Sequence, residues 1–137
     1  MSSKISLQKV QLIDFPKVKD STGILHFLER ADLLPEGIKR AFWISEVSEQ
    51  SNRGKHAHLR ESQVLVAVSG IVEVWAHQAG QKAVKFSLDR PNLGVFIPAL
   101  TWVETKFSKG AILLGFSNQE FSESDYIRNL DEFEKYQ

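Results

Sequence analysis

Two histidines separated by a single residue, His56 and His58, are the clearest candidates for chemistry in this chain. If the segment that carries them is a β-strand, both imidazoles project from one face, about 7 Å apart along the strand. Paired imidazoles on one wall suit two tasks, metal binding and proton transfer near neutral pH. This pattern by itself leaves both tasks open.

The surrounding sequence offers little else to a metal ion. A catalytic metal site normally has three protein ligands and an open position. The third candidate ligand is Gln63, and a neutral amide is a weak ligand for zinc or iron. The chain contains no cysteine, which excludes thiolate and iron–sulfur sites. We therefore expect no metal and no other cofactor.

The elements that must position these histidines read as short β-strands. Segments rich in Val, Ile, Phe and Trp dominate from residue 39 onward, and turn-forming residues separate them. Many short strands with turns between them are typical of an all-β sandwich or barrel. The predicted strands cover residues 24–28, 40–44, 64–68, 71–76, 83–88, 94–97, 102–107 and 111–116.

The C-terminal segment has a different pattern. Residues 122–125 resemble a helix cap, and apolar residues follow them at helical spacing. We expect a short helix that carries Tyr126, Ile127, Leu130 and Phe133.

Length and charge narrow the function further. The chain has 137 residues with no linker or repeat, so we expect residues 1–137 to form one domain. Its 17 basic and 17 acidic residues cancel, which argues against a nucleic-acid partner. No apolar run is long enough to span a bilayer, and the polar N-terminus lacks the apolar core of a signal peptide. We expect a cytoplasmic protein with no membrane partner.

Several motifs, in order and at characteristic spacing, resemble one family. His-x-His followed by Gln63 and Gly70 is similar to the first motif of cupins, with Gln63 where metal-binding cupins usually have Glu. A closer resemblance, over most of the chain, is to the dTDP-sugar 3,4-ketoisomerases, the WxcM-like or FdtA-type cupins. Its motifs are Arg53-Gly54-Lys55-His56-Ala57-His58, Gln63-Val64-Leu65, Ser69-Gly70, Asp20-Ser21-Thr22-Gly23, Ile38-Lys39-Arg40, Phe107-Ser108 and residues 124–133.

This resemblance implies a fold and an activity. The fold is a cupin jelly roll (a double-stranded β-helix) with a short C-terminal helical tail. The activity is the metal-independent transfer of a keto group between C4 and C3 of a dTDP-4-keto-6-deoxyhexose, in amino-sugar synthesis for surface polysaccharide. The resemblance also implies a homodimer, often with exchanged N-terminal strands.

By the same resemblance, His58 is the base that removes the C3 proton and His56 is its helper. A histidine suits this work because its reference pKa of about 6.5 lies near the operating pH. The residue types around the motif suggest contacts with the substrate, each with a plainer alternative. The candidates for substrate binding are Arg53, Arg40, Gln63, Trp43, Trp102 and Glu104.

The two arginines suit anionic groups of a substrate. Arg53 can bind a diphosphate, or it is a solvated turn residue. Arg40, between apolar residues, needs an anion if it faces inward, and a structural salt bridge is its alternative.

The other candidates also have two interpretations each. Gln63 can hydrogen-bond the sugar or belong to a network inside the barrel. Trp43 and Trp102 can stack on a thymine base, although tryptophans are more often core residues. Glu104 can supply a replacement acid or base, or be an exposed strand carboxylate.

Four positions depart from the family pattern. Thr22 stands where Arg is usual, Phe42 and Trp43 stand where two tyrosines are common, and Val103 replaces a histidine. Most of these changes remove hydrogen-bonding groups. The alternative hypothesis is therefore a non-catalytic cupin that binds a nucleotide sugar, and a metal-dependent cupin enzyme is a third.

Overall fold

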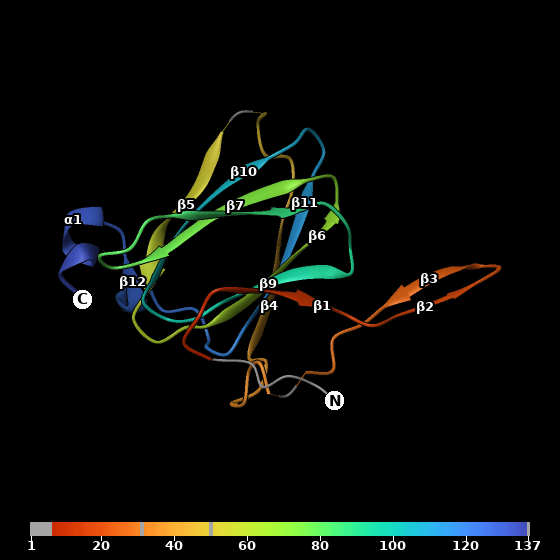
Figure 1. Cartoon of the computed structure of the whole chain (residues 1–137), viewed down its shortest axis with the longest axis horizontal. Helices are drawn as coiled ribbons and strands as arrows, with labels where there is room; N and C mark the ends of the chain where they lie inside the picture. The colour runs from red at the N-terminus through yellow and green to blue at the C-terminus, as the bar shows by residue number, and fades with distance from the viewer. Residues whose placement is uncertain (1–6, 31, 50, 137) are drawn as a thin grey trace.

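Two antiparallel five-stranded sheets make up most of the computed structural model, which describes residues 7–30, 32–49 and 51–136 (Figure 1). The first sheet has the order β1 (Gln11–Asp14), β9 (Leu93–Ile97), β6 (Gln63–Ser69), β11 (Ile112–Ser117) and β4 (Arg40–Ile44). The second has the order β12 (Tyr126–Ile127), β5 (Asn52–His58), β10 (Thr101–Phe107), β7 (Val72–Gln78) and β8 (Val84–Leu88). The all-β prediction is therefore confirmed.

Side chains alternate between the two faces of these strands, and the inward ones form the core. In β7, Val72, Val74 and Ala76 are buried while the residues between them are partly exposed. They pack against Leu65 of β6 and Val95 of β9 from the facing sheet. The core lies between the two sheets, as in other β-sandwiches.

Each sheet also has a smaller apolar cluster of its own, separate from the main core. In the first sheet, Val64 and Phe96 belong to a cluster with Leu33 and Leu34 from the segment before β4. This explains why β6 and β9 read as continuous apolar runs rather than alternating ones. In the second sheet, Ile127 and Phe133 of the C-terminal segment pack against Ala57 of β5 and Trp102 of β10.

A third, two-stranded element projects from this body. The strands β2 (Lys17–Asp20) and β3 (Gly23–His26) form a hairpin that pairs only with itself within the described residues. Figure 1 shows the hairpin extending away from the two sheets. Its apolar residues Val18, Ile24 and Leu25 are exposed.

Every predicted strand overlaps a strand of the structure, but β1 and β2 were not predicted and the C-terminal prediction is wrong in part. Tyr126 and Ile127 form β12 instead of starting a helix, because their backbone pairs with His58 and Ala57 of β5. The helix α1 covers only Leu130–Phe133, and the side chain of Asn129 caps it by accepting a hydrogen bond from the backbone of Glu132. Short 3-10 turns flank it at Glu123–Asp125 and Glu134–Tyr136. None of the described helices is long and apolar enough to cross a membrane.

Candidate active site

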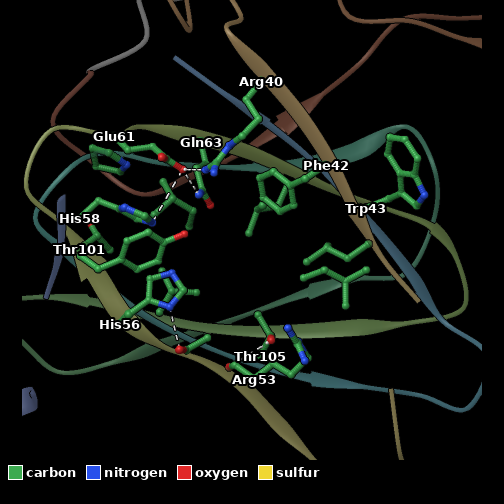
Figure 2. A pocket seen from close by; sticks show the side chains of 18 residues that line it. Arg40, Phe42, Trp43, Arg53, His56, His58, Glu61, Gln63, Thr101 and Thr105 are labelled. Atoms are coloured by element: carbon green, nitrogen blue, oxygen red, sulfur yellow. Dashed lines mark hydrogen bonds and ion pairs between the residues drawn. The ribbon is translucent and has the colours of Figure 1, made fainter. Parts of the chain in front are cut away.

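A cavity of about 310 Å³ lies between the two sheets, a size that suits a small-molecule ligand. Figure 2 shows His58, Glu61, Gln63 and Arg40 gathered at one end, with Trp43 and Arg53 toward the other. The lining residues are Arg40, Phe42, Trp43, Ile44, Arg53, Gly54, His56, His58, Glu61, Gln63, Leu65, Ile97, Pro98, Thr101, Val103, Thr105, Leu113 and Tyr126.

A bulge in β5 determines which of its residues face this cavity. His56 pairs with Val103, but Gly54 pairs with Glu104, so Lys55 is an extra residue opposite β10. Gly54 and Lys55 both have positive φ angles, of 90° and 48°. Strict alternation would place Arg53 and His56 on opposite faces, whereas the bulge allows both to line the cavity.

The same bulge fixes the protonation pattern of His56. Its Nδ1 lies 2.7 Å from the carbonyl oxygen of Gly54, and a carbonyl can only accept, so Nδ1 carries the proton. The Nε2 atom is therefore left as an acceptor. Burial lowers the pKa of His56 to about 4, against the opposing effect of the Gly54 hydrogen bond. His56 is thus neutral at physiological pH.

His58 has a different environment, between two carboxylates. Its Nδ1 lies 3.3 Å from Oδ2 of Asp125, and its Nε2 lies 3.8 Å from Oε2 of Glu61. Donation from Nδ1 to Asp125 leaves Nε2 unprotonated. Burial lowers the pKa of His58, while the charges of Glu61 and Asp125 act to raise it. Of the two imidazoles, His58 is the one that has a buried carboxylate near each ring nitrogen.

Glu61 is in turn held by the polar residues of the neighbouring strands. Nη2 of Arg40 lies 2.7 Å from its Oε2, and the amide of Gln63 donates to the same oxygen. Arg40 therefore forms the salt bridge, and Gln63 the internal hydrogen-bond network, that the sequence analysis gave as alternatives to substrate binding. Both side chains nevertheless line the cavity.

Tyr126 is the main site residue that the sequence analysis missed. It lies beside His58 on the neighbouring strand β12, and its ring centroid is 4.3 Å from that of His58 and 4.9 Å from that of His56. The guanidinium carbon of Arg128 lies 4.3 Å from the same ring centroid. The residue was assigned to a helix, where it would not pair with β5. The available signal was its place in the motif of residues 124–133.

Asp125 and Glu61 were also missed. Asp125 is buried and accepts hydrogen bonds from the backbone of Arg60 and Glu61, so it fastens the segment after β5 to the C-terminal region. It lies 67 residues from His58 in the chain. No local sequence pattern indicates such a pairing.

The remaining predicted residues divide between the cavity and the opposite face of the sheet. Trp43 lines the cavity and is 69% exposed, and Arg53 lines it as well. Trp102 and Glu104 do not line it, because alternation along β10 turns Thr101, Val103 and Thr105 inward instead. Trp102 packs against Phe133 and donates to Glu104, so the structure places both away from the substrate site predicted for them.

Three of the four family departures face the cavity. Phe42, Trp43 and Val103 all line it, so one part of its wall is apolar. Gly115 of β11 leaves room for the ring of Phe42, which a β-carbon at Gly115 would overlap. Thr22 lies instead at the turn of the β2–β3 hairpin, where its backbone and hydroxyl both donate to Asp20.

One group of described residues has atoms close enough to hold a metal ion, namely His58, Glu61 and Asp125, whose ligand atoms lie within 4.8 Å of one another. Asp125 already accepts two backbone N–H groups, and Glu61 is already paired with Arg40. These contacts suit carboxylates that hold an imidazole, and they do not mark a metal centre.

Unsatisfied polar atoms concentrate at this cavity. Within the part of the chain that the structure describes, four buried side-chain atoms have no hydrogen-bond partner. Three of them, Nε of Arg40, Nε2 of His58 and Oγ1 of Thr101, belong to residues that line the cavity. Because buried polar groups are normally hydrogen-bonded, the arrangement suits a ligand that carries several polar groups of its own.

Comparison with known proteins identifies the family. The sequence profile of FdtA, described as "WxcM-like, C-terminal", matches residues 8–137. The chain belongs to the FdtA (WxcM-like) family. The resemblance drawn from the sequence motifs is therefore confirmed.

Relatives of this chain are similar to it over nearly their whole lengths. TDP-4-oxo-6-deoxy-alpha-D-glucose-3,4-oxoisomerase of Aneurinibacillus thermoaerophilus is 33% identical over 127 residues, 92% of this chain and 91% of that protein. A 3,4-ketoisomerase from Helicobacter canadensis is 35% identical, with a TM-score of 0.86 over 92% of this chain and 95% of that one.

A third relative was solved with a nucleotide. The sugar 3,4-ketoisomerase QdtA of Thermoanaerobacterium thermosaccharolyticum, in complex with TDP, is 32% identical, with a TM-score of 0.86 over 95% of each chain. These matches confirm the prediction of a cupin-like jelly roll.

Proposed function

We propose that this protein is an isomerase that moves the keto group of a dTDP-4-keto-6-deoxyhexose between C4 and C3. The observation that carries the proposal is the pair of neutral imidazoles on one cavity wall, each with Nδ1 committed to the protein and Nε2 left as an acceptor. The names of the family relatives support the same reaction and the same class of substrate.

In this reaction His58 is the base. Its Nε2 removes the proton from C3, and the C–H electron pair forms the C3–C4 double bond of an enediolate while the C4 carbonyl oxygen gains the negative charge. The imidazolium that forms is stabilised by Asp125 at Nδ1 and by Glu61 near Nε2. Return of the proton to C4, together with movement of the hydroxyl proton from the C3 oxygen to the C4 oxygen, leaves the ketone at C3.

His56 is the helper in this scheme. Its low pKa makes it a poor carrier of a proton in the resting enzyme, whereas its free Nε2 can accept a hydrogen bond from a sugar hydroxyl and orient the ring. At the far end of the cavity, Arg53 is suited to the diphosphate and Trp43 to the thymine base. Arg40 and Gln63 hold Glu61 and keep donors at the cavity wall.

The first experiment is incubation of the protein with dTDP-4-keto-6-deoxyglucose in D2O, followed by proton NMR. We expect a 3-keto product that carries solvent deuterium. In His58→Asn we expect turnover to fall by roughly 10²–10⁴-fold, the usual contribution of a general base. The matched control is His77→Asn, because His77 lies on β7, does not line this cavity and pairs with Glu134.

Two results would contradict the proposal. Full activity of His58→Asn with an intact fold would remove His58 as the base. Saturable binding of the nucleotide sugar with no deuterium exchange in the unmodified protein would favour the binding cupin instead, for which the apolar lining by Phe42, Trp43 and Val103 is the supporting observation.

We also propose a homodimer in which the β2–β3 hairpin docks on a second copy. Exposed apolar residues on an element that pairs with nothing else in the described chain support this arrangement. The cytoplasmic location and the absence of a nucleic-acid partner stay predictions from the sequence.

A further inference from the structure

The proposed reaction moves a second proton that the two histidines do not readily supply. When the keto group passes from C4 to C3, one hydrogen passes from C3 to C4 and another passes from the C3 oxygen to the C4 oxygen. Both Nε2 atoms that face the cavity are unprotonated in the resting protein, because both Nδ1 atoms are the ones that donate. The C4 oxygen therefore needs a different proton donor.

Several polar side chains that line the cavity already form hydrogen bonds within the protein, so they are poor candidates for this donor. Arg40 and the amide of Gln63 are bound to Glu61, and the hydroxyl of Thr105 donates to the carbonyl oxygen of Arg53. The hydroxyl of Thr101 has no partner, but an aliphatic alcohol is a far weaker acid than a phenol.

One phenol lines the cavity. The chain contains two tyrosines, and Tyr126 lies at the cavity while Tyr136 follows the C-terminal helix. The ring of Tyr126 contacts both imidazoles, and the rings of His56 and His58 contact each other with centroids 4.9 Å apart. The three proton-transfer groups thus form a triangle on one wall.

The position of Tyr126 is fixed from two sides. Its backbone pairs with His58, so its side chain lies next to that imidazole on the same sheet face. Arg128 holds the ring through a cation–π contact and is itself held by Glu123, with nitrogen–oxygen distances of 2.7 and 2.9 Å. A phenol held in this way is suited to act without rearrangement.

We propose that Tyr126 is a catalytic residue that carries the proton between the two sugar oxygens. Its hydroxyl gives a proton to the C4 oxygen as the enediolate forms, and it recovers one from the C3 hydroxyl as the new ketone forms. His58 carries the carbon-bound proton from C3 to C4, so both groups end in their starting states. This inference rests on the proposed isomerase function.

Phe42 and Trp43 also line the cavity, but neither side chain can exchange a proton with a sugar oxygen. In this chain Tyr126 remains as the phenol on the cavity wall.

The test compares Tyr126→Phe with Tyr136→Phe in steady-state kinetics on dTDP-4-keto-6-deoxyglucose. Tyr126→Phe keeps the ring that packs against both histidines and removes only the hydroxyl. We expect kcat to fall by roughly 10²–10⁴-fold, with KM within about threefold of the original value. Tyr136→Phe loses the same hydroxyl outside the cavity, and we expect it to keep full activity.

The outcomes separate this inference from the proposed function. If the unmodified protein isomerises the sugar and Tyr126→Phe does so at the same rate, the role of Tyr126 is wrong while the isomerase function stands. If Tyr126→Phe loses affinity for dTDP in calorimetry in proportion to its loss of rate, the tyrosine only shapes the site and the inference is overturned. If the unmodified protein itself is inactive, the proposed function fails first.

Discussion

At the scale of single residues, His56 and His58 lie on the same strand but have different hydrogen-bond partners and different charges around them. A backbone carbonyl orients His56 and adds no charge, whereas a buried carboxylate orients His58 and a second carboxylate lies near its other nitrogen. An imidazole that must hold a proton during a reaction benefits from the anionic neighbours. This contrast supports the proposal that His58, and not His56, is the base.

Asp125→Asn tests the contrast at His58. The amide of Asn can donate to Nδ1, which would move the imidazole proton to Nε2 and remove the base. We expect kcat to fall by roughly 10²–10⁴-fold while KM changes little. The measurement is steady-state kinetics with the sugar substrate.

Thermal unfolding provides the control for Asp125→Asn, because Asp125 also accepts two backbone hydrogen bonds. A small loss of stability with a large loss of kcat supports a positioning role. Unchanged kcat in a folded variant would show that the carboxylate does not set the tautomer of His58.

At the scale of elements, the bulge in β5 is the feature that assembles the site. It turns Arg53 to the same cavity as His56 and aims the carbonyl of Gly54 at the imidazole. The left-handed conformation of Gly54 is one that residues with a side chain rarely adopt. A β-carbon at this position would also lie 2.9 Å from the carbonyl oxygen of Val103.

Gly54→Ala should therefore disturb both the fold and the site. We expect a loss of about 2–3 kcal/mol of stability, from the backbone strain and the close contact with Val103, together with lower activity. Gly37→Ala is a matched control, because Gly37 has a φ of 88° against 90° for Gly54 and nothing lies within 4 Å of the added carbon. Chemical denaturation of both variants is the measurement.

The difference between the two variants isolates the contact at the bulge. Equal destabilisation would mean that the strand shifts to relieve the contact. Unchanged activity of Gly54→Ala would then show that His56 does not depend on the geometry of Gly54.

At the scale of the whole molecule, the projecting hairpin is the part that the two-sheet body leaves without a partner. Val18 and Leu25 are cross-strand neighbours on one face of the hairpin, and they are 54% and 62% exposed. A two-stranded hairpin is marginally stable alone in water, so a second copy that covers this face would stabilise it.

Sedimentation of the intact protein tests the proposed dimer. We expect twice the chain mass of 15.5 kDa. The double substitution of Val18→Glu and Leu25→Glu should shift the equilibrium to the monomer, because docking would bury two carboxylates without partners. Val84→Glu is the control, on an exposed residue of β8 in the main body. A monomeric unmodified protein, or a double variant that dimerises as strongly, would contradict the arrangement.

Much of this protein was determined by local sequence. The apolar periodicity predicted most strands of the two sheets, although not β1 or β12. The His-x-His motif with its flanking segments predicted the family, the two imidazoles and their shared face. Local pattern succeeds here because side-chain alternation and turn chemistry act over a few residues.

Tertiary structure decided what depends on distant segments. The pairing of β12 with β5 overrode the helical spacing around Tyr126, and it brought Asp125 to His58 from 67 residues away. The alternation of β10 turned Trp102 and Glu104 outward, although their residue types had suggested substrate contacts. Which strands pair, and which face each one buries, depends on packing the whole core at once, and no short stretch of sequence contains that information.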